Sequence, residues 1–93
     1  MDLLGQTCVV AGATVTAQEA EESILAYLRE FPGKLIDEWS VLNKLCNRGN
    51  REENRIERVF FRRQFYRLVR ERKVVRYRGG LGRGKIRISE AFV

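Results

Sequence analysis

Four arginines recur along one edge of a helix-like segment in the second half of this chain, NREENRIERVFFRRQFYRLVRER (50–72). On a helix that turns about 100° per residue, these side chains fall within roughly 60° of one another. They are Arg51, Arg55, Arg58 and Arg62. A guanidinium group presents a planar fork of N–H donors, which suits phosphate oxygens and the two acceptors of a guanine edge. The spacing therefore indicates binding chemistry, with a polyanion as the ligand.

Charge is distributed unevenly along the 93 residues. Residues 1–46 hold three basic and seven acidic side chains, whereas residues 47–93 hold fifteen basic and five acidic ones, within a net charge of +6. Such asymmetry predicts an electrostatic face, and polyanions are the usual partners of such faces. The alternative is a solvated basic surface that only favours solubility.

Other reactive residue types are few. The chain has no histidine, and Cys8 and Cys46 stand far apart without a CxxC pair, so it lacks the ligands of a zinc finger. We interpret both cysteines as buried thiols, although a disulfide stays open. Because no nucleophile–base pair is evident, we expect no enzyme, no metal and no cofactor.

The N-terminal segment 3–17 carries no charge, but it lacks two features of targeting segments. Asp2 stands where a signal peptide is basic, and the segment is too short and too rich in Gly, Thr and Gln to span a membrane. We therefore expect a soluble, cytoplasmic protein without a membrane partner.

The length predicts a single domain with a modest core. We place that domain at residues 16–93. Residues 1–15 precede it and have strand-like content at Thr7-Cys8-Val9-Val10. They can be a loose tail, an added edge strand or a dimer-forming arm.

Three helices should position the arginines. Thr16-Ala17-Gln18-Glu19 is a capping box that opens the first helix, which Pro32-Gly33 stops. After an extended piece at 34–36, Asp37 can cap a second helix from Glu38 to about Asn47. That helix should bury Trp39, Leu42, Leu45 and Cys46. Asn50 and Glu53 can cap the third helix, which should end near Arg72.

A hairpin should follow the third helix. Two runs alternate apolar and basic residues around a glycine-rich connector, which predicts two strands with one apolar and one basic face. The runs are Val75-Arg76-Tyr77-Arg78 and Lys85-Ile86-Arg87-Ile88. The connector 79–85 formally matches the phosphate-binding pattern G-x-x-x-x-G-K. However, Ile86 stands where Ser or Thr should hold magnesium and a strand follows, so we interpret this match as accidental.

Aromatic residues interleave with the arginines, a pattern that also occurs where bases stack on a protein. The helical spacing of Phe60, Phe61, Phe65 and Tyr66 favours the core instead. Tyr77 is the aromatic residue least suited to burial.

In this order of elements the chain resembles a winged helix-turn-helix domain over residues 16–89. Leu35-Ile36 corresponds to its first strand and Trp39 to Cys46 to its second helix. Arg51 to Arg72 corresponds to the recognition helix, and Tyr77 to Ile86 to the wing. The phrase FRRQFYRLVRERKVVRYR (61–78) is typical of the family. The third helix is longer than usual, and the turn before it holds several residues.

The resemblance implies an α+β fold of three helices and a small antiparallel sheet with a glycine-rich wing. It also implies sequence-specific binding of double-stranded DNA in transcriptional regulation, by a homodimer. The third helix would enter the major groove and the wing would touch phosphate or the minor groove. The implied DNA-binding residues are Arg51, Asn54, Arg55 and Arg58 near bases, Arg62 near the backbone, and Arg78, Arg83 and Lys85 on the wing.

Two other functions stay open. The acidic first half of one copy can complement the basic second half of another in an assembly module. The chain can also bind RNA or single strands, which we favour if Tyr77 and the edge of Tyr66 face solvent.

Overall fold

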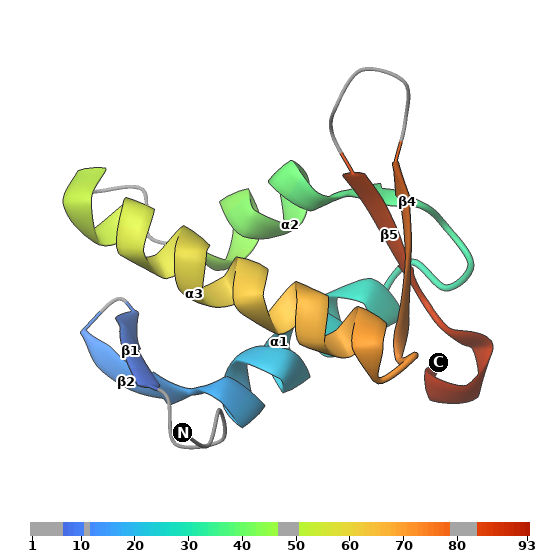
Figure 1. The fold of residues 1–93 in the computed structure, drawn as a ribbon, viewed down its shortest axis with the longest axis horizontal. Helices are drawn as coiled ribbons and strands as arrows, with labels where there is room; N and C mark the ends of the chain where they lie inside the picture. The colour runs from blue at the N-terminus through green and yellow to red at the C-terminus, as the bar shows by residue number, and fades with distance from the viewer. Residues whose placement is uncertain (1–6, 11, 47–50, 79–83) are drawn as a thin grey trace.

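The computed structural model describes residues 7–10, 12–46, 51–78 and 84–93, and for 51–53 the backbone alone. A short hairpin and a helix lead into a two-residue strand, two more helices and a second hairpin (Figure 1). The bounds are β1 Thr7–Val10, β2 Ala13–Thr16, α1 Ala17–Arg29, β3 Ile36–Asp37, α2 Glu38–Leu45, α3 Arg51–Arg70, β4 Val74–Arg78, β5 Gly84–Ile88 and the 3-10 turn η2 Glu90–Phe92. No helix in the described ranges is long and apolar enough to cross a membrane.

Helix α1 begins at the predicted capping box. The N–H of Glu19 donates to Thr16 Oγ1 at 3.1 Å, and the N–H of Thr16 donates to Glu19 Oε1 at 3.0 Å. Two amides at the helix start are thereby satisfied, which confirms the prediction. Thr16 is also the last residue of β2, so the hairpin runs directly into α1.

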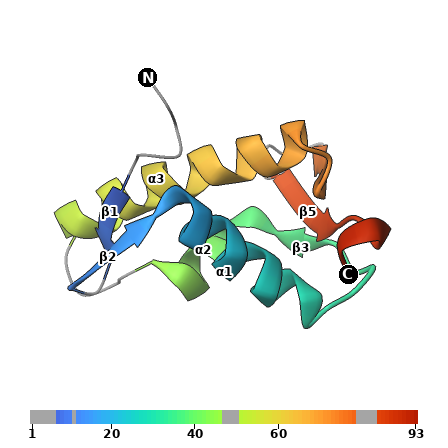
Figure 2. The same cartoon turned by 90° about the horizontal axis from the view of Figure 1, so that it is seen from below.

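Residues 7–16 form the β1–β2 hairpin, an antiparallel pair in which Cys8 lies opposite Val15. Gly12 has a φ of +83°, a left-handed conformation that glycine adopts at no steric cost, and it turns the hairpin. Val10 and Val15 pack against the core. Figure 2 shows the hairpin beside the N-terminal half of α3. One face of the hairpin is thus part of the packed structure.

The second sheet is antiparallel with strand order β3-β5-β4. Val74 pairs with Ile88 and Arg76 with Ile86, so these four residues share the face that packs on the core. The predicted apolar face of Val75 and Tyr77 is therefore wrong. Alternation with a period of two is equally consistent with Val74 or Val75 facing the core, because shifting the pattern by one residue exchanges the two faces.

The core forms where α3 crosses α1 and the second sheet. Phe61, Phe65 and Leu68, the predicted apolar stripe of α3, are buried, as is Phe60. Their buried neighbours from other elements include Ile24, Leu28, Leu42, Ile86 and Ile88.

Cys8 and Cys46 join this core as buried free thiols, as predicted. Burial raises the pKa of Cys46 to about 11 and also raises the pKa of Cys8. Both sulfurs are therefore held in the protonated, weakly nucleophilic form at neutral pH.

Helix α2 begins at its predicted cap, where Asp37 Oδ1 accepts from the N–H of Trp39 at 2.8 Å. The predicted burial of Trp39 is wrong, because its side chain is 46% exposed. Val41 and Leu42 set the buried stripe of this short helix, and Glu38 lies between their directions on a helical wheel. Trp39 falls about 60° beyond Leu42 and so points out of the core.

The third helix ends two residues before its predicted limit. Arg72 has a φ of +62°, its N–H donates to the carbonyl of Val69, and the N–H of Lys73 donates to the carbonyl of Leu68. This double closure of the last turn is a Schellman motif, which stops the helix at Arg70 and sends the chain into β4.

The described structure is thus an α+β fold of three helices and small antiparallel sheets, as predicted. Its order of elements is compatible with a winged-helix topology.

A buried ion pair ties α1 to α3. Arg67 Nε lies 3.0 Å from Glu21 Oε1, and both side chains are largely buried. This contact is an ion pair and does not have the geometry of a hydrogen bond. Among the described residues, neither Glu21 Oε1 nor Arg67 Nη1 makes a hydrogen bond. Because burial outweighs the attraction of Arg67, the pKa of Glu21 is raised above its usual value.

Replacing Glu21 should change how stability depends on pH. The folded state favours protonated Glu21, so the wild type loses stability as the pH rises from the unfolded-state pKa through the raised folded-state pKa. We expect Glu21→Gln to remove this loss, so that the variant gains relative to the wild type between pH 4 and pH 7. Urea unfolding across that range measures it, with exposed Glu22 as the control position for the same substitution. An equal slope in wild type and Glu21→Gln would contradict the assignment.

Candidate nucleic-acid interface

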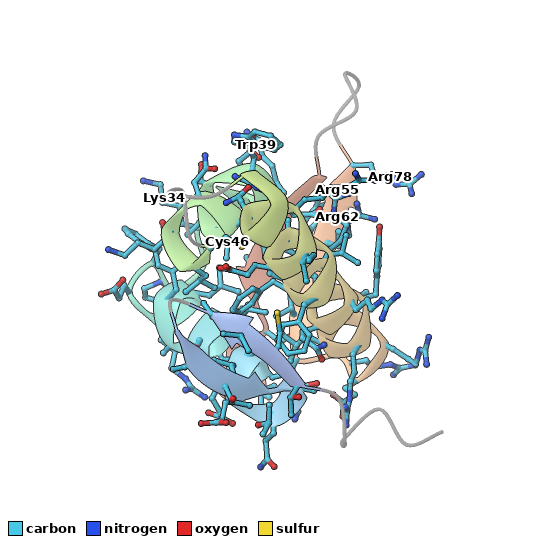
Figure 3. The ribbon with its side chains drawn as sticks, turned by 90° about the vertical axis from the view of Figure 1, so that its left-hand side faces the viewer. Lys34, Trp39, Cys46, Arg55, Arg62 and Arg78 are labelled. Atoms are coloured by element: carbon cyan, nitrogen blue, oxygen red, sulfur yellow. The ribbon has the colours of Figure 1, made fainter. Side chains whose placement is uncertain are left out.

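The exposed side of α3 carries a basic flank, which we call the arginine flank and define as Arg55, Arg62 and Tyr66. All three side chains are exposed, and they fall within about 40° on the helical wheel. Figure 3 shows Arg55 and Arg62 on the same side of the molecule as Arg78, at the end of β4. The structure therefore brings three predicted site residues from α3 and the β4–β5 hairpin to one side.

Lys85 lies on the other face of the β4–β5 hairpin. It pairs with Tyr77, whereas Arg78 pairs with Gly84 one step along the register. Successive residues of a strand point to opposite faces, so the side chains of Lys85 and Arg78 point to opposite faces of the hairpin. Both are exposed, but they do not form a single cluster.

The side chain of Arg58, on α3, contacts α2. Its guanidinium carbon lies 4.4 Å from the centre of the Trp39 ring, its Nε donates to Asn54 Oδ1 at 2.7 Å, and its Nη2 donates to Asn43 Oδ1. Arg58 Nη1 is buried. The predicted base-contacting residues Asn54 and Arg58 thus contact each other, and Arg58 also contacts α2.

Two further predicted site residues cannot be placed. Arg51 begins α3, but its side chain lies outside the described residues, and Arg83 belongs to the undescribed segment 79–83. The proposed cap residue Asn50 and the formal phosphate-binding pattern at 79–85 also fall wholly or largely outside the described chain. Strand β5 begins at Gly84, near the end of the pattern, and includes the predicted strand Lys85-Ile86-Arg87-Ile88.

A cleft of about 170 Å³ separates α2, α3 and the β4–β5 hairpin. Arg62 and Tyr66 of α3, Trp39 of α2 and Arg76 of β4 line this cleft. Its walls therefore combine arginine side chains with the half-exposed rings of Trp39 and Tyr66.

An ion pair joins the hairpin to α2 at the base of this cleft. Arg76 Nε donates to both carboxylate oxygens of Glu38, at 2.9 Å and 3.2 Å. The guanidinium carbon also lies 5.3 Å from the centre of the Tyr66 ring, within cation–π range. The hydrogen bond to Glu38 is the largest cause of the raised pKa of Arg76. Arg76 thus links three elements that form the interface.

Gly84 leaves room for this ion pair. Its backbone is not left-handed, so glycine is not needed there for its conformational freedom. Instead, a Cβ at this position would overlap Glu38 Oε2 and approach Arg76 Nε to 3.0 Å. The absence of a side chain at Gly84 allows the carboxylate to sit against the strand.

Comparisons with known protein families, curated proteins and solved structures find no significant match. The interface is therefore interpreted from its own geometry. Within the described part of the chain, no group of three or more histidine, cysteine or acidic residues could hold a metal ion.

Sequence reasoning missed Glu38, Trp39 and Arg76 as parts of this site. Trp39 was assigned to the core and Arg76 to an outward basic face. One signal was present, because Glu38 lies between Val41 and Leu42 on the α2 wheel and a carboxylate there needs a basic partner. The sequence did not indicate which arginine would supply it.

Substituting Gly84 tests how the ion pair is accommodated. Gly84→Ala should displace the flexible Glu38 side chain and weaken its hydrogen bonds to Arg76, lowering the free energy of unfolding by about 1–2 kcal/mol. In a Glu38→Ala background the same change should cost much less, because the overlapping carboxylate is gone. Urea unfolding of the four proteins in this double-mutant cycle measures the coupling. Additive effects would show that Gly84 and Glu38 are independent.

Proposed function

We propose that the protein binds double-stranded DNA through the arginine flank of α3 and the β4–β5 hairpin. The observation that carries the proposal is the gathering of Arg55, Arg62 and Arg78 on one side of the molecule (Figure 3). Arginines at this spacing can neutralise phosphates on either side of a groove and release counterions. A role in transcriptional regulation would follow from sequence-specific binding.

The order of elements supports a winged-helix reading of this surface. Helix α1, strand β3, helices α2 and α3 and the β4–β5 hairpin follow one another as in that fold, with sheet order β3-β5-β4. In the winged-helix arrangement α3 would lie in the major groove and the hairpin would reach the backbone or minor groove. Helix α1 crosses behind α3 in Figure 1 and also contacts β5, so it supports both α3 and the β4–β5 hairpin.

The contacts in the structure favour separate roles for the predicted residues. Arg55 and Arg62 are exposed and would contact DNA directly. Arg58 stacks on Trp39 and bonds to Asn43 and Asn54, so it would position α3 against α2. Arg78 and Lys85 would contact phosphates from opposite faces of the hairpin.

Single alanine substitutions should change the salt dependence of DNA binding. Each lost phosphate contact reduces the slope of log K against log salt concentration by about 0.9. We expect Arg62→Ala and Arg78→Ala each to weaken duplex binding and to reduce the slope by about this amount. Fluorescence anisotropy of a labelled duplex across a salt series measures both quantities.

Lys34→Ala is the matched control, because it removes one positive charge from the opposite side in Figure 3. It should leave the slope nearly unchanged. If all three variants lose affinity equally, only net charge matters and the arginine flank is not the interface. If Arg62→Ala and Arg78→Ala bind like the wild type, the proposal fails.

A second candidate function is binding of single-stranded nucleic acid or RNA. Tyr66 and Tyr77 are both solvent-facing, at 47% and 45% exposure, which is the condition that favours this alternative. Trp39 is similarly exposed. Tyr66 lies beside Arg76, Tyr77 beside Arg87 and Trp39 beside Arg58. Aromatic rings next to basic groups suit stacked bases and their phosphates.

The sole tryptophan, Trp39, reports on this alternative. Base stacking in the cleft should quench its fluorescence and be worth roughly 1–3 kcal/mol per base. If the second candidate holds, a single-stranded oligonucleotide should quench Trp39 and outcompete duplex, and Tyr66→Leu should weaken that binding. If duplex wins the competition and single strands leave the fluorescence unchanged, the second candidate is dropped.

A further inference from the structure

Among the described strands, β1 has one edge without a partner. It pairs with β2 along one side, and no other described strand pairs with it. Exposed sheet edges are normally protected by charged side chains, proline or a covering element, because their backbone groups can recruit another strand. The ten residues of the β1–β2 hairpin include no charged side chain and no proline. Along its described residues this edge therefore has neither charge nor proline to protect it, and no described strand covers it.

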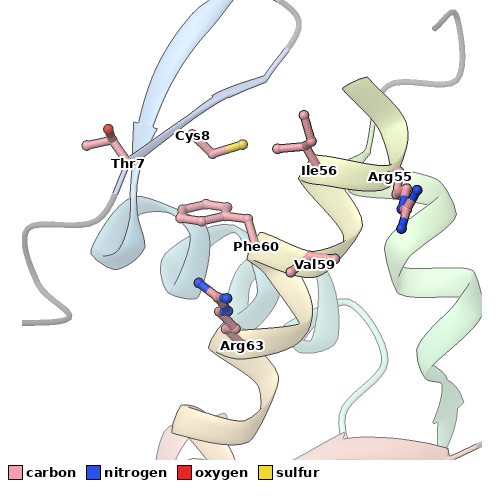
Figure 4. Close-up of a pocket in the computed structure, with 7 residues that line it drawn as sticks. All are labelled: Thr7, Cys8, Arg55, Ile56, Val59, Phe60 and Arg63. Atoms are coloured by element: carbon pink, nitrogen blue, oxygen red, sulfur yellow. The ribbon is translucent and has the colours of Figure 1, made fainter. Parts of the chain in front are cut away.

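An apolar pocket of about 520 Å³ lies beside this strand, between β1 and α3. Thr7 and Cys8 line it from β1, whereas Ile56, Val59 and Phe60 line it from α3 (Figure 4). No residue of β2 lines the pocket, so the pocket lies on the side of β1 away from β2. Figure 4 shows the side chain of Ile56 directed toward Cys8 across the opening. The unpartnered edge and the pocket therefore form one continuous surface.

Large apolar side chains are exposed around this surface. Val9, Ile56 and Val59 are 62%, 60% and 49% exposed. Ile56 and Val59 lie about 100° and 40° around α3 from Arg55, so they border the arginine flank, and Arg55 also lines the pocket. Apolar groups gathered beside a strand edge are typical of an interaction surface.

We propose that this surface binds a second copy of the chain. Two β1 strands pair antiparallel across a twofold axis, giving a four-stranded sheet in the order β2-β1-β1-β2. Each chain then covers the other's Ile56 and Val59, and the main-chain groups of both edges are paired.

Charge distinguishes a second copy from other occupants. The hairpin is uncharged, so two copies can pair along β1 without opposing like charges across the strands. The exposed Arg55 and Arg63 stand at the rim of the pocket. In a symmetric dimer these arginines repel weakly across solvent, and salt screens that repulsion. Self-association through β1 is therefore strengthened by salt, whereas binding of an acidic segment at the same rim is weakened.

Sedimentation of the free protein over a range of concentrations tests the dimer without nucleic acid. The wild type should show a reversible monomer–dimer equilibrium. Ile56→Lys and Val9→Lys each place a charge in the interface and should weaken dimerisation by at least about tenfold. Both positions are exposed in the monomer, so both variants should fold, which circular dichroism checks. Val93→Lys is the matched control, because Val93 is also 60% exposed and lies at the far end of the molecule, and it should dimerise like the wild type.

Three outcomes would overturn the proposal. They are a monomer at all concentrations, a dimer that Ile56→Lys and Val9→Lys leave intact, and self-association that salt weakens. The last would instead support pairing of the acidic half of one copy with the basic half of another. Amide hydrogen exchange gives a second measurement, since the amides of β1 should become more protected as the protein concentration rises. Because DNA is absent, failure of this test leaves the proposed DNA binding untouched.

Discussion

The burial of one side of α3 is the constraint on which the rest of this structure depends. A 93-residue chain can build one modest core, and Phe61, Phe65 and Leu68 of the 20-residue α3 supply much of its centre. α1, the second sheet and the β1–β2 hairpin all pack on that side. The exposed part of α3 includes the arginine flank and, bordering it, the apolar pair Ile56 and Val59. These two surfaces support different proposals, and Arg55 lies where they meet.

Polar contacts then fix the elements around the arginine flank. Arg76 joins β4 to Glu38 of α2 and lies over Tyr66 of α3, while Arg58 joins α3 to Trp39 and Asn43 of α2. Both arginines come from the basic half of the chain, yet they serve contacts within the protein. A high arginine content is therefore an incomplete guide to a binding surface, because part of it is committed to internal hydrogen bonds and stacking.

Local signals in the sequence predicted the elements well. The capping box at Thr16, the cap at Asp37 and the apolar stripe of α3 are confirmed because each depends on residues within one or two helical turns. The predictions that were wrong concern which side of a helix or strand faces the core. Trp39 was placed in the core and Arg76 on the outer face of β4, and both assignments depend on which side of an element meets the rest of the protein. Adjacent Val74 and Val75 leave the phase of β4 undecided until β5 pairs with it.

The sequence by itself determined the order of elements from α1 to β5, the charge asymmetry and the four arginines on one helical edge, because these follow from spacing and composition. It left open whether residues 1–15 form a tail, a strand or an arm. Tertiary structure decided which of those arginines face solvent. It exposed Arg55 and Arg62 and placed Arg58 against Trp39, because only the packing of α2 on α3 brings that ring and the Asn43 side chain within reach. It also brought the uncharged β1 edge beside Ile56 and Val59, residues more than forty positions away. Contacts between distant segments depend on the packing of the whole chain, which local periodicity does not specify.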